Sequence, residues 1–172
     1  GTTGIADGCA PSVLHRPFDN LPSLAAILRE GWAFVGADYP GLGTGGVHTY
    51  LVGVDAARAV LDSVRAARQF NDASLSPRVV VWGHSQGGHS ALWTGSRAIE
   101  FTPELQVNGV AALAPASDLQ GLVKASKSSI FGKIVSSYLI TAYAHAYEDV
   151  RVEDYVGFGP RMIATALATR CV

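Results

Sequence analysis

Residues 78–93 read RVVVWGHSQGGHSALW, and this stretch decides the fold. A β-branched run, residues 78–82, leads into Gly83-His84-Ser85-Gln86-Gly87, and a helix-forming run follows. A Gly-x-Ser-x-Gly pattern alone is a weak signal, since short Gly/Ser patterns occur in many loops. Between a buried strand and a helix it predicts a nucleophile elbow, a tight turn that holds a serine hydroxyl at the tip of a sheet.

An elbow of this kind is expected to hold Ser85 in a strained backbone conformation. We expect Gly83 and Gly87 to relieve collisions where the strand and the helix fold back on each other, with His84 between strand and nucleophile. The alternative is a glycine-rich connection that carries an ordinary solvent-facing serine.

Strands and helices alternate through the first two thirds of the chain. Apolar runs of strand length lie at residues 32–37, 79–82 and 107–114. Helical patterns lie at residues 21–29, 52–70 and from the elbow to about residue 99. This alternation predicts an α/β fold with a mostly parallel sheet, right-handed crossovers and chemistry at the carboxyl ends of the strands.

Beyond Asp118 the pattern becomes mostly helical. We expect residues 1–118 to form an α/β core segment with the elbow, and residues 119–172 to form a helical cap segment. Apolar side chains repeat with helical spacing over residues 130–143. A cap over an ester-hydrolysing serine needs an apolar inner face, because each buried acyl CH₂ gains ~0.8 kcal/mol. The stripe therefore predicts an acyl pocket lined by Phe131, Val135 and Leu139, with plain core packing as the alternative.

Composition excludes several classes of function. The 172 residues carry a formal net charge of −1 without a basic or acidic block, so neither nucleic acid nor an anionic membrane surface is an expected partner. No apolar run reaches the ~20 residues of a membrane-spanning helix. Only 16% of residues are charged and mean hydropathy is +0.22, which favours a surface partly covered by another segment. The first residues, Gly1-Thr2-Thr3-Gly4, are those expected of a mature or excised piece.

A serine nucleophile needs a general base, an orienting carboxylate and donors for the oxyanion. One donor is expected to be the backbone N–H of Gln86, at the positive end of the helix that follows the elbow. The second should come from a loop after a neighbouring strand, where Asp38 stands first. A turn-starting aspartate is an equal reading of Asp38 on pattern alone.

Four stretches together resemble the secretory lipases of the Candida antarctica lipase A type, which include many bacterial members. They are residues 7–12 (DGCAPS), 31–41 (GWAFVGADYPG), 83–88 (GHSQGG) and 102–110 (TPELQVNGV), and the resemblance extends over essentially the whole chain. It implies an α/β-hydrolase that is secreted, acts on acylglycerols or simpler esters, and needs no metal or organic cofactor.

The same resemblance assigns roles to individual residues. It places Ser85 at the nucleophile and Asp38 with Gln86 at the oxyanion hole. Cysteine count leaves two free thiols and one bridge equally open, whereas the resemblance favours a disulfide between Cys9 and Cys171. A bridge implies an oxidising, extracytoplasmic compartment.

The chain departs from the family in the rest of the triad. α/β-Hydrolases place the acid and then the histidine after the nucleophile. Family members are roughly twice as long as this chain, so the resemblance implies a chain that is truncated within or just after the helical cap. Asp118 fits a turn or helix cap, Asp149 and Asp154 fit solvated positions near a helix end, and His145 fits the polar face of the later helix. His84 and His89 flank the elbow and fit packing or hydrogen-bonding positions. His15 and His48 lie in loops before the serine, the wrong side in chain order. We expect the missing C-terminal half of the same protein to supply the acid and the base.

Three functions follow from these observations. The first is a serine carboxylic-ester hydrolase that acts on acyl esters or lipids, present here as one part. The second is a non-catalytic α/β remnant that binds acyl ligands. The third is a serine acyltransferase that uses the same elbow and excludes water.

Overall fold

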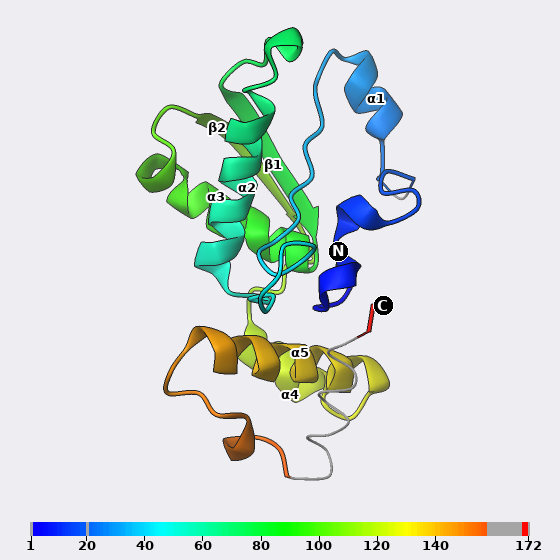
Figure 1. Cartoon of the computed structure of the whole chain (residues 1–172), viewed down its shortest axis with the longest axis vertical. Coiled ribbons are helices and arrows are strands. Elements are labelled where there is room, and N and C mark those ends of the chain that lie inside the picture. The colour runs from blue at the N-terminus through cyan, green and yellow to red at the C-terminus, as the bar shows by residue number, and fades with distance from the viewer. Residues whose placement is uncertain (1, 20, 158–169, 172) are drawn as a thin grey trace.

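A pair of parallel strands, β1 (Arg78–His84) and β2 (Gln106–Leu113), lies in the upper part of the molecule (Figure 1). The computed structural model describes residues 2–19, 21–157 and 170–171. Arg78 pairs with Gln106 and His84 with Leu113, with one irregularity in register between Val79 and Val80. The parallel arrangement requires a crossover connection, which the helix after β1 provides.

The helices follow the expected order. Their bounds are α1 (Leu24–Arg29), α2 (Gly53–Ala67), α3 (Gln86–Phe101), α4 (Leu119–Ser126) and α5 (Ile130–Ala146). Short 3-10 turns occur at Asp7–Cys9, Pro11–Val13, Asn71–Ala73 and Val152–Asp154. The α/β fold with a parallel sheet is therefore confirmed.

Helix α3 connects the two strands and packs against both of them, and α2 packs on α3. A small apolar cluster of Leu61, Ala98 and Leu105 fills the space between α2, α3 and the start of β2. This layer of helices fixes the angle at which α3 leaves β1, and so fixes the turn between them.

The last two helices form a second layer below the sheet (Figure 1). Asp118 caps α4 by accepting a hydrogen bond from the Gly121 N–H at 2.9 Å, and Ser129 caps α5 in the same way through Gly132 at 2.9 Å. The main apolar core lies where α5 meets the N-terminal residues that precede α1 and the loop before α2. Its buried members are Ile5, Tyr50, Leu51, Ala116, Val135, Tyr138, Leu139 and Ala142.

The strand expected at residues 32–37 does not form. This segment has no regular secondary structure, and the Phe34 ring meets the Trp82 ring of β1 with centroids 6.4 Å apart. No ladder joins it to a strand among the described residues, and Trp32 and Val35 remain exposed. Apolar composition sets which side chains a strand would bury, but a strand also needs a hydrogen-bonded neighbour.

A disulfide joins Cys9 to Cys171, as the resemblance implies. Gly4 also forms an isolated antiparallel bridge with Cys171, so the two ends of the chain lie together (Figure 1). The sulfur of Cys9 is fully buried, in a small cluster with Ala10 and Leu42. The bridge therefore fastens the chain's last residues to the segment that precedes the loop of Asp38.

Within the described residues, every helix is too short or too polar to cross a membrane.

Removal of the disulfide should lower the free energy of unfolding. The bridge closes a loop with a sequence separation of 162 residues. Chain entropy assigns up to about 5 kcal/mol to a loop of this size. Urea unfolding of the double variant Cys9→Ser, Cys171→Ser, compared with the oxidised and the chemically reduced parent, measures the loss. Reduced parent and double variant should agree, and an unchanged unfolding free energy in both would contradict the expectation.

Candidate active site

Ser85 occupies the turn between β1 and α3 with φ 56° and ψ −113°. Such angles are costly for a residue with a side chain, and the surrounding hydrogen bonds hold them. The Ser85 N–H donates to the Leu113 carbonyl at 3.0 Å. Its own carbonyl accepts from the His89 N–H at 3.0 Å and from the Ala116 N–H at 3.3 Å. The turn is thus pinned to the end of β2 on both sides of the serine.

Glycines make this turn possible, though not the pair expected from sequence. A Cβ on Gly83 would lie 2.3 Å from the backbone of Gly87, which no adjustment of a side chain could relieve. A Cβ on Gly87 would meet nothing within 4 Å, so that part of the expectation is wrong. The second constrained position is Gly88, where a Cβ would lie 3.0 Å from the Leu113 carbonyl oxygen and the Pro115 Cα.

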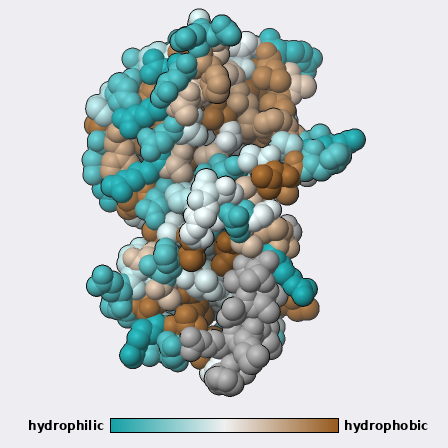
Figure 2. Space-filling model, viewed as in Figure 1, coloured by the Kyte–Doolittle hydropathy of each residue, from teal (hydrophilic) through white to brown (hydrophobic). Residues whose placement is uncertain are grey.

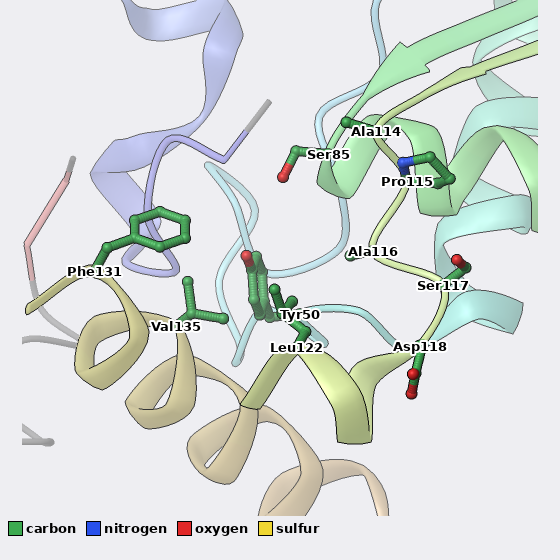
Figure 3. Close-up of a pocket in the computed structure, with 10 residues that line it drawn as sticks. All are labelled: Tyr50, Ser85, Ala114, Pro115, Ala116, Ser117, Asp118, Leu122, Phe131 and Val135. Carbon is green, nitrogen blue, oxygen red and sulfur yellow. The ribbon is translucent and has the colours of Figure 1, made fainter. Parts of the chain in front are cut away.

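A cavity of about 260 Å³ opens beside Ser85 (Figure 3). Ten residues line it: Tyr50, Ser85, Ala114, Pro115, Ala116, Ser117, Asp118, Leu122, Phe131 and Val135. Figure 3 shows the Ser85 side chain pointing from the elbow toward the space that Phe131, Val135 and Tyr50 face. The walls opposite the hydroxyl are therefore mainly apolar and aromatic.

The three residues of the expected acyl pocket separate into two groups. Phe131 and Val135, in the first turns of α5, line the cavity with Ser85. Leu139 is absent from the lining that the described residues form; it is 9% exposed and packs in the main apolar core. The reason is geometric, since Leu139 lies about 6 Å farther than Val135 along the helix axis.

The backbone N–H of Gln86 opens α3 and has no hydrogen-bond acceptor among the described residues. The Asp38 carboxylate accepts a bond from the Ser12 N–H at 3.1 Å, so its side chain tethers the loop to the first segment instead of starting a local turn. The next residue, Tyr39, donates its phenol to Ser90 Oγ of α3 at 2.8 Å. The loop of Asp38 is thereby fastened to the first turns of α3.

The histidines of the described chain do not reach the Ser85 hydroxyl, which forms no hydrogen bond with any described residue. His84 and His145 are exposed. His89 is buried, and its Nδ1 lies 2.9 Å from the Ala116 carbonyl. The described residues also contain no group of three or more histidine, cysteine or acidic side chains that could hold a metal ion.

A buried contact that sequence reasoning missed joins His48 to Gln86. His48 is 2% exposed, and its Nε2 lies 3.0 Å from Gln86 Nε2. Its Nδ1 lies 3.0 Å from the Pro40 carbonyl. The two residues stand 38 positions apart, and no spacing rule connects them.

Ser85 lies at the carboxyl end of a parallel strand, in a strained turn that leads into a helix. This arrangement defines an α/β-hydrolase. Residues 19–171 match the secretory lipase family, and the chain belongs to that family.

Individual relatives agree with the family match. Lipase 2 of Candida albicans is 29% identical over 133 residues, which cover 74% of this chain and 28% of that protein. Lipase 1 of the same yeast is 26% identical over 153 residues, 86% of this chain and 31% of that protein. The chain thus spans less than a third of the length of these relatives.

Among solved structures, Candida antarctica lipase A in its closed state superposes with a TM-score of 0.75 at 20% identity, covering 98% of this chain and 43% of that one. A putative hydrolase of Legionella pneumophila gives a TM-score of 0.72 at 18% identity, covering 98% of this chain and 50% of that one. Both likenesses concern the fold.

Acid should destabilise the folded chain through its two buried histidines. Burial lowers the pKa of His48 and of His89 below the ordinary 6.5, and bonds to backbone carbonyls oppose the shift in part. The unfolded chain then binds protons at a higher pH than the folded chain. The free energy of unfolding is fully retained above about pH 6.5 and falls as the pH drops below it.

Urea unfolding from about pH 8 to about pH 5 measures this slope. His48→Gln should flatten it, whereas His145→Gln, at an exposed position, should leave it as in the parent. An equal slope in His48→Gln and the parent would contradict the role of His48.

Proposed function

We propose that this chain carries the nucleophile and the oxyanion site of a serine carboxylic-ester hydrolase, a lipase or esterase, with Ser85 as the nucleophile. The observation that carries the proposal is the strained, partly exposed serine whose side chain points into an apolar cavity (Figure 3). Strain of this kind persists only where the surrounding structure holds it, and Ser85 is held by three backbone hydrogen bonds.

In the proposed reaction, Ser85 Oγ attacks the ester carbonyl carbon and gives its proton to a general base. The tetrahedral oxyanion is stabilised by the backbone N–H of Gln86 and by that of Asp38. Collapse expels the alcohol, which takes the proton, and leaves an acyl group on Ser85 for water to remove. Oxyanion donors act by fixed dipoles and are worth 10²–10³-fold in rate each. Neither the acylation of Ser85 nor the removal of the acyl group by water requires a metal or an organic cofactor.

The proposed substrate is an acyl ester or lipid whose chain occupies the cavity beside Phe131 and Val135. Helices α4 and α5 act as a cap segment, because they cover the side of the elbow toward which the serine points (Figures 1 and 3). Secretion is the proposed location, in keeping with the family and with the disulfide.

The proposed partner is a further part of the same protein that supplies the triad acid and histidine. Parallel sheets are normally covered on both faces, yet Val80, Val110 and Leu113 of the two strands are 43%, 41% and 50% exposed. Figure 2 shows a broad apolar area on the upper part of the molecule, the part that contains the sheet. Such a surface fits additional strands or helices better than water.

Labelling with an alkyl fluorophosphonate tests Ser85 directly. The chain should gain one label, slowly, because no described histidine contacts the hydroxyl. Ser85→Ala should abolish the label, and Ser117→Ala, at an exposed serine lining the same cavity, should retain it. Intact-mass spectrometry gives the count. A label that persists in Ser85→Ala would overturn the assignment, and a chain that binds acyl ligands without any label would be the non-catalytic remnant.

Steady-state hydrolysis of p-nitrophenyl esters should be weak for the same reason. Oxyanion stabilisation and binding alone leave a residual ~10³–10⁴-fold acceleration over water in serine hydrolases that lack triad members. Turnover at ordinary enzyme rates of ~1–10³ per second would mean that a histidine of this chain is the base, and His145 would be the first to replace. Competition by added alcohols distinguishes hydrolysis from acyl transfer.

Selectivity for acyl length should depend on Phe131. Phe131→Ala removes a cavity wall, and loss of contact with about two CH₂ groups, at ~0.8 kcal/mol each, should slow labelling by a long-chain fluorophosphonate roughly tenfold relative to a short one. Ile130→Ala is the matched control, since Ile130 is the adjacent residue of α5, is exposed to solvent (79%, against 63% for Phe131), and lies outside the described lining. Equal slowing of both reagents in Phe131→Ala would show that the wall does not contact the acyl chain.

A further inference from the structure

His48 is the most deeply buried histidine of the described chain, and it lies in a stack of aromatic rings. The Tyr39 ring is stacked on it with centroids 5.6 Å apart and planes at 13°. The Tyr50 ring meets it edge-on at 6.0 Å. Because water cannot reach a side chain that is 2% exposed, the protein itself must satisfy both ring nitrogens.

The two partners of the ring define its protonation. The Pro40 carbonyl can only accept, so Nδ1 carries the hydrogen and donates to it. The amide nitrogen of Gln86 can only donate, so Nε2 of His48 carries no hydrogen and accepts from it. The ring is therefore neutral, in the Nδ1–H form. Burial lowers the pKa of His48, in agreement with a neutral ring.

Gln86 is held from two directions. Its side chain donates to His48, and its backbone carbonyl accepts from Ser90 Oγ at 3.0 Å. Ser90 Oγ in turn accepts from the Tyr39 phenol at 2.8 Å. Two bonds thus join the loop of residues 38–48 to the first turns of α3, one at the Gln86 side chain and one at Ser90 Oγ.

We infer that His48 is a positioning residue. By accepting a hydrogen bond from the Gln86 side-chain amide, it holds the loop of Asp38 and the start of α3 at a fixed separation. At that separation the backbone N–H groups of Asp38 and Gln86 can bind the same oxyanion. The inference rests on the oxyanion roles proposed above for Asp38 and Gln86. It assigns a catalytic contribution to a side chain that touches neither the substrate nor Ser85.

Protonation of His48 would place a second N–H against the amide donor of Gln86 and break the contact. The titratable groups that face the ring are the phenols of Tyr39 and Tyr50, and burial raises the pKa of both, so neither changes charge near neutral pH. The labelling rate of Ser85 should therefore follow the neutral fraction of His48 and fall toward acid.

A matched pair of variants separates the two contacts of the ring. His48→Asn keeps a short amide that can donate to the Pro40 carbonyl and loses the acceptor for Gln86. His48→Gln has a longer side chain, which keeps an acceptor for Gln86 and loses the hydrogen bond to the Pro40 carbonyl. Misplacement of an oxyanion donor should cost less than its removal, so His48→Asn should lower kcat for p-nitrophenyl acetate roughly tenfold at unchanged KM. His48→Gln should stay within about threefold of the parent by the same reasoning.

A merely structural role predicts a different result. The activity of each variant would then fall in proportion to the decrease in its melting temperature. His48→Asn and His48→Gln would have the same kcat at equal stability, and this outcome would overturn the inference. The parent is the reference for the proposed function: if fluorophosphonate does not label Ser85 in the parent, the proposed function fails. If the parent is labelled and His48→Asn is labelled at the same rate, only the inference about His48 fails.

Nitrogen-15 NMR of the parent tests the inference without any variant. At neutral pH the His48 ring should show a protonated Nδ1 and an unprotonated Nε2. The acid limb of the labelling rate should coincide with the titration of that ring. The opposite tautomer, or a labelling rate that does not change while His48 titrates, would overturn the inference even where a variant does not fold.

Discussion

The hydrogen bonds between the Ser85 peptide and the end of β2 are the interactions on which the rest of the site depends. The Ser85 N–H donates to the Leu113 carbonyl, and the Ser85 carbonyl accepts from the Ala116 N–H. They hold a backbone conformation that the chain would otherwise leave, and they do so only because Gly83 and Gly88 let strand and helix approach closely. Directly after β2, Ala114 has a positive φ of 41° and lines the cavity beside the serine.

A second set of contacts sets the distance between the elbow and the helices that cover it. Tyr50 meets the Tyr138 ring of α5 edge-on at 5.6 Å, and its phenol lies 2.9 Å from Thr2 Oγ1. The Tyr143 phenol donates to the Leu51 carbonyl at 3.2 Å. Through Tyr50 the aromatic stack that contains His48 is continuous with the core beneath α5. A shift of α5 would therefore displace the loop of Asp38 as well as the walls of the cavity.

Local signals in the sequence were sufficient for the elbow, the helices and the parallel pair, because strand propensity, turn chemistry and helix capping act over a few residues. Residues 32–37 show where this fails, since a strand also needs a partner that no local pattern describes. Leu139 shows a second limit: periodicity identified the apolar face of α5, but only tertiary packing determines which turn of that face reaches the cavity. No sequence pattern predicts the contact between His48 and Gln86, because it forms only when a long loop packs back against α3.

The proposed function separates the electrostatic part of ester hydrolysis from proton transfer. On the proposed assignment, the oxyanion donors are backbone groups whose positions depend on the elbow, on the loop of Asp38 and on His48, all of which are fixed by hydrogen bonds within the described chain. Fixed dipoles need no reorganisation during the reaction, so this part of the site can be complete before any base is present. The Ser85 hydroxyl, by contrast, has no hydrogen-bond partner among the described residues. On this proposal, a base that completed the triad would meet a serine and an oxyanion site already in place, and it would change the rate of proton transfer without having to build the site.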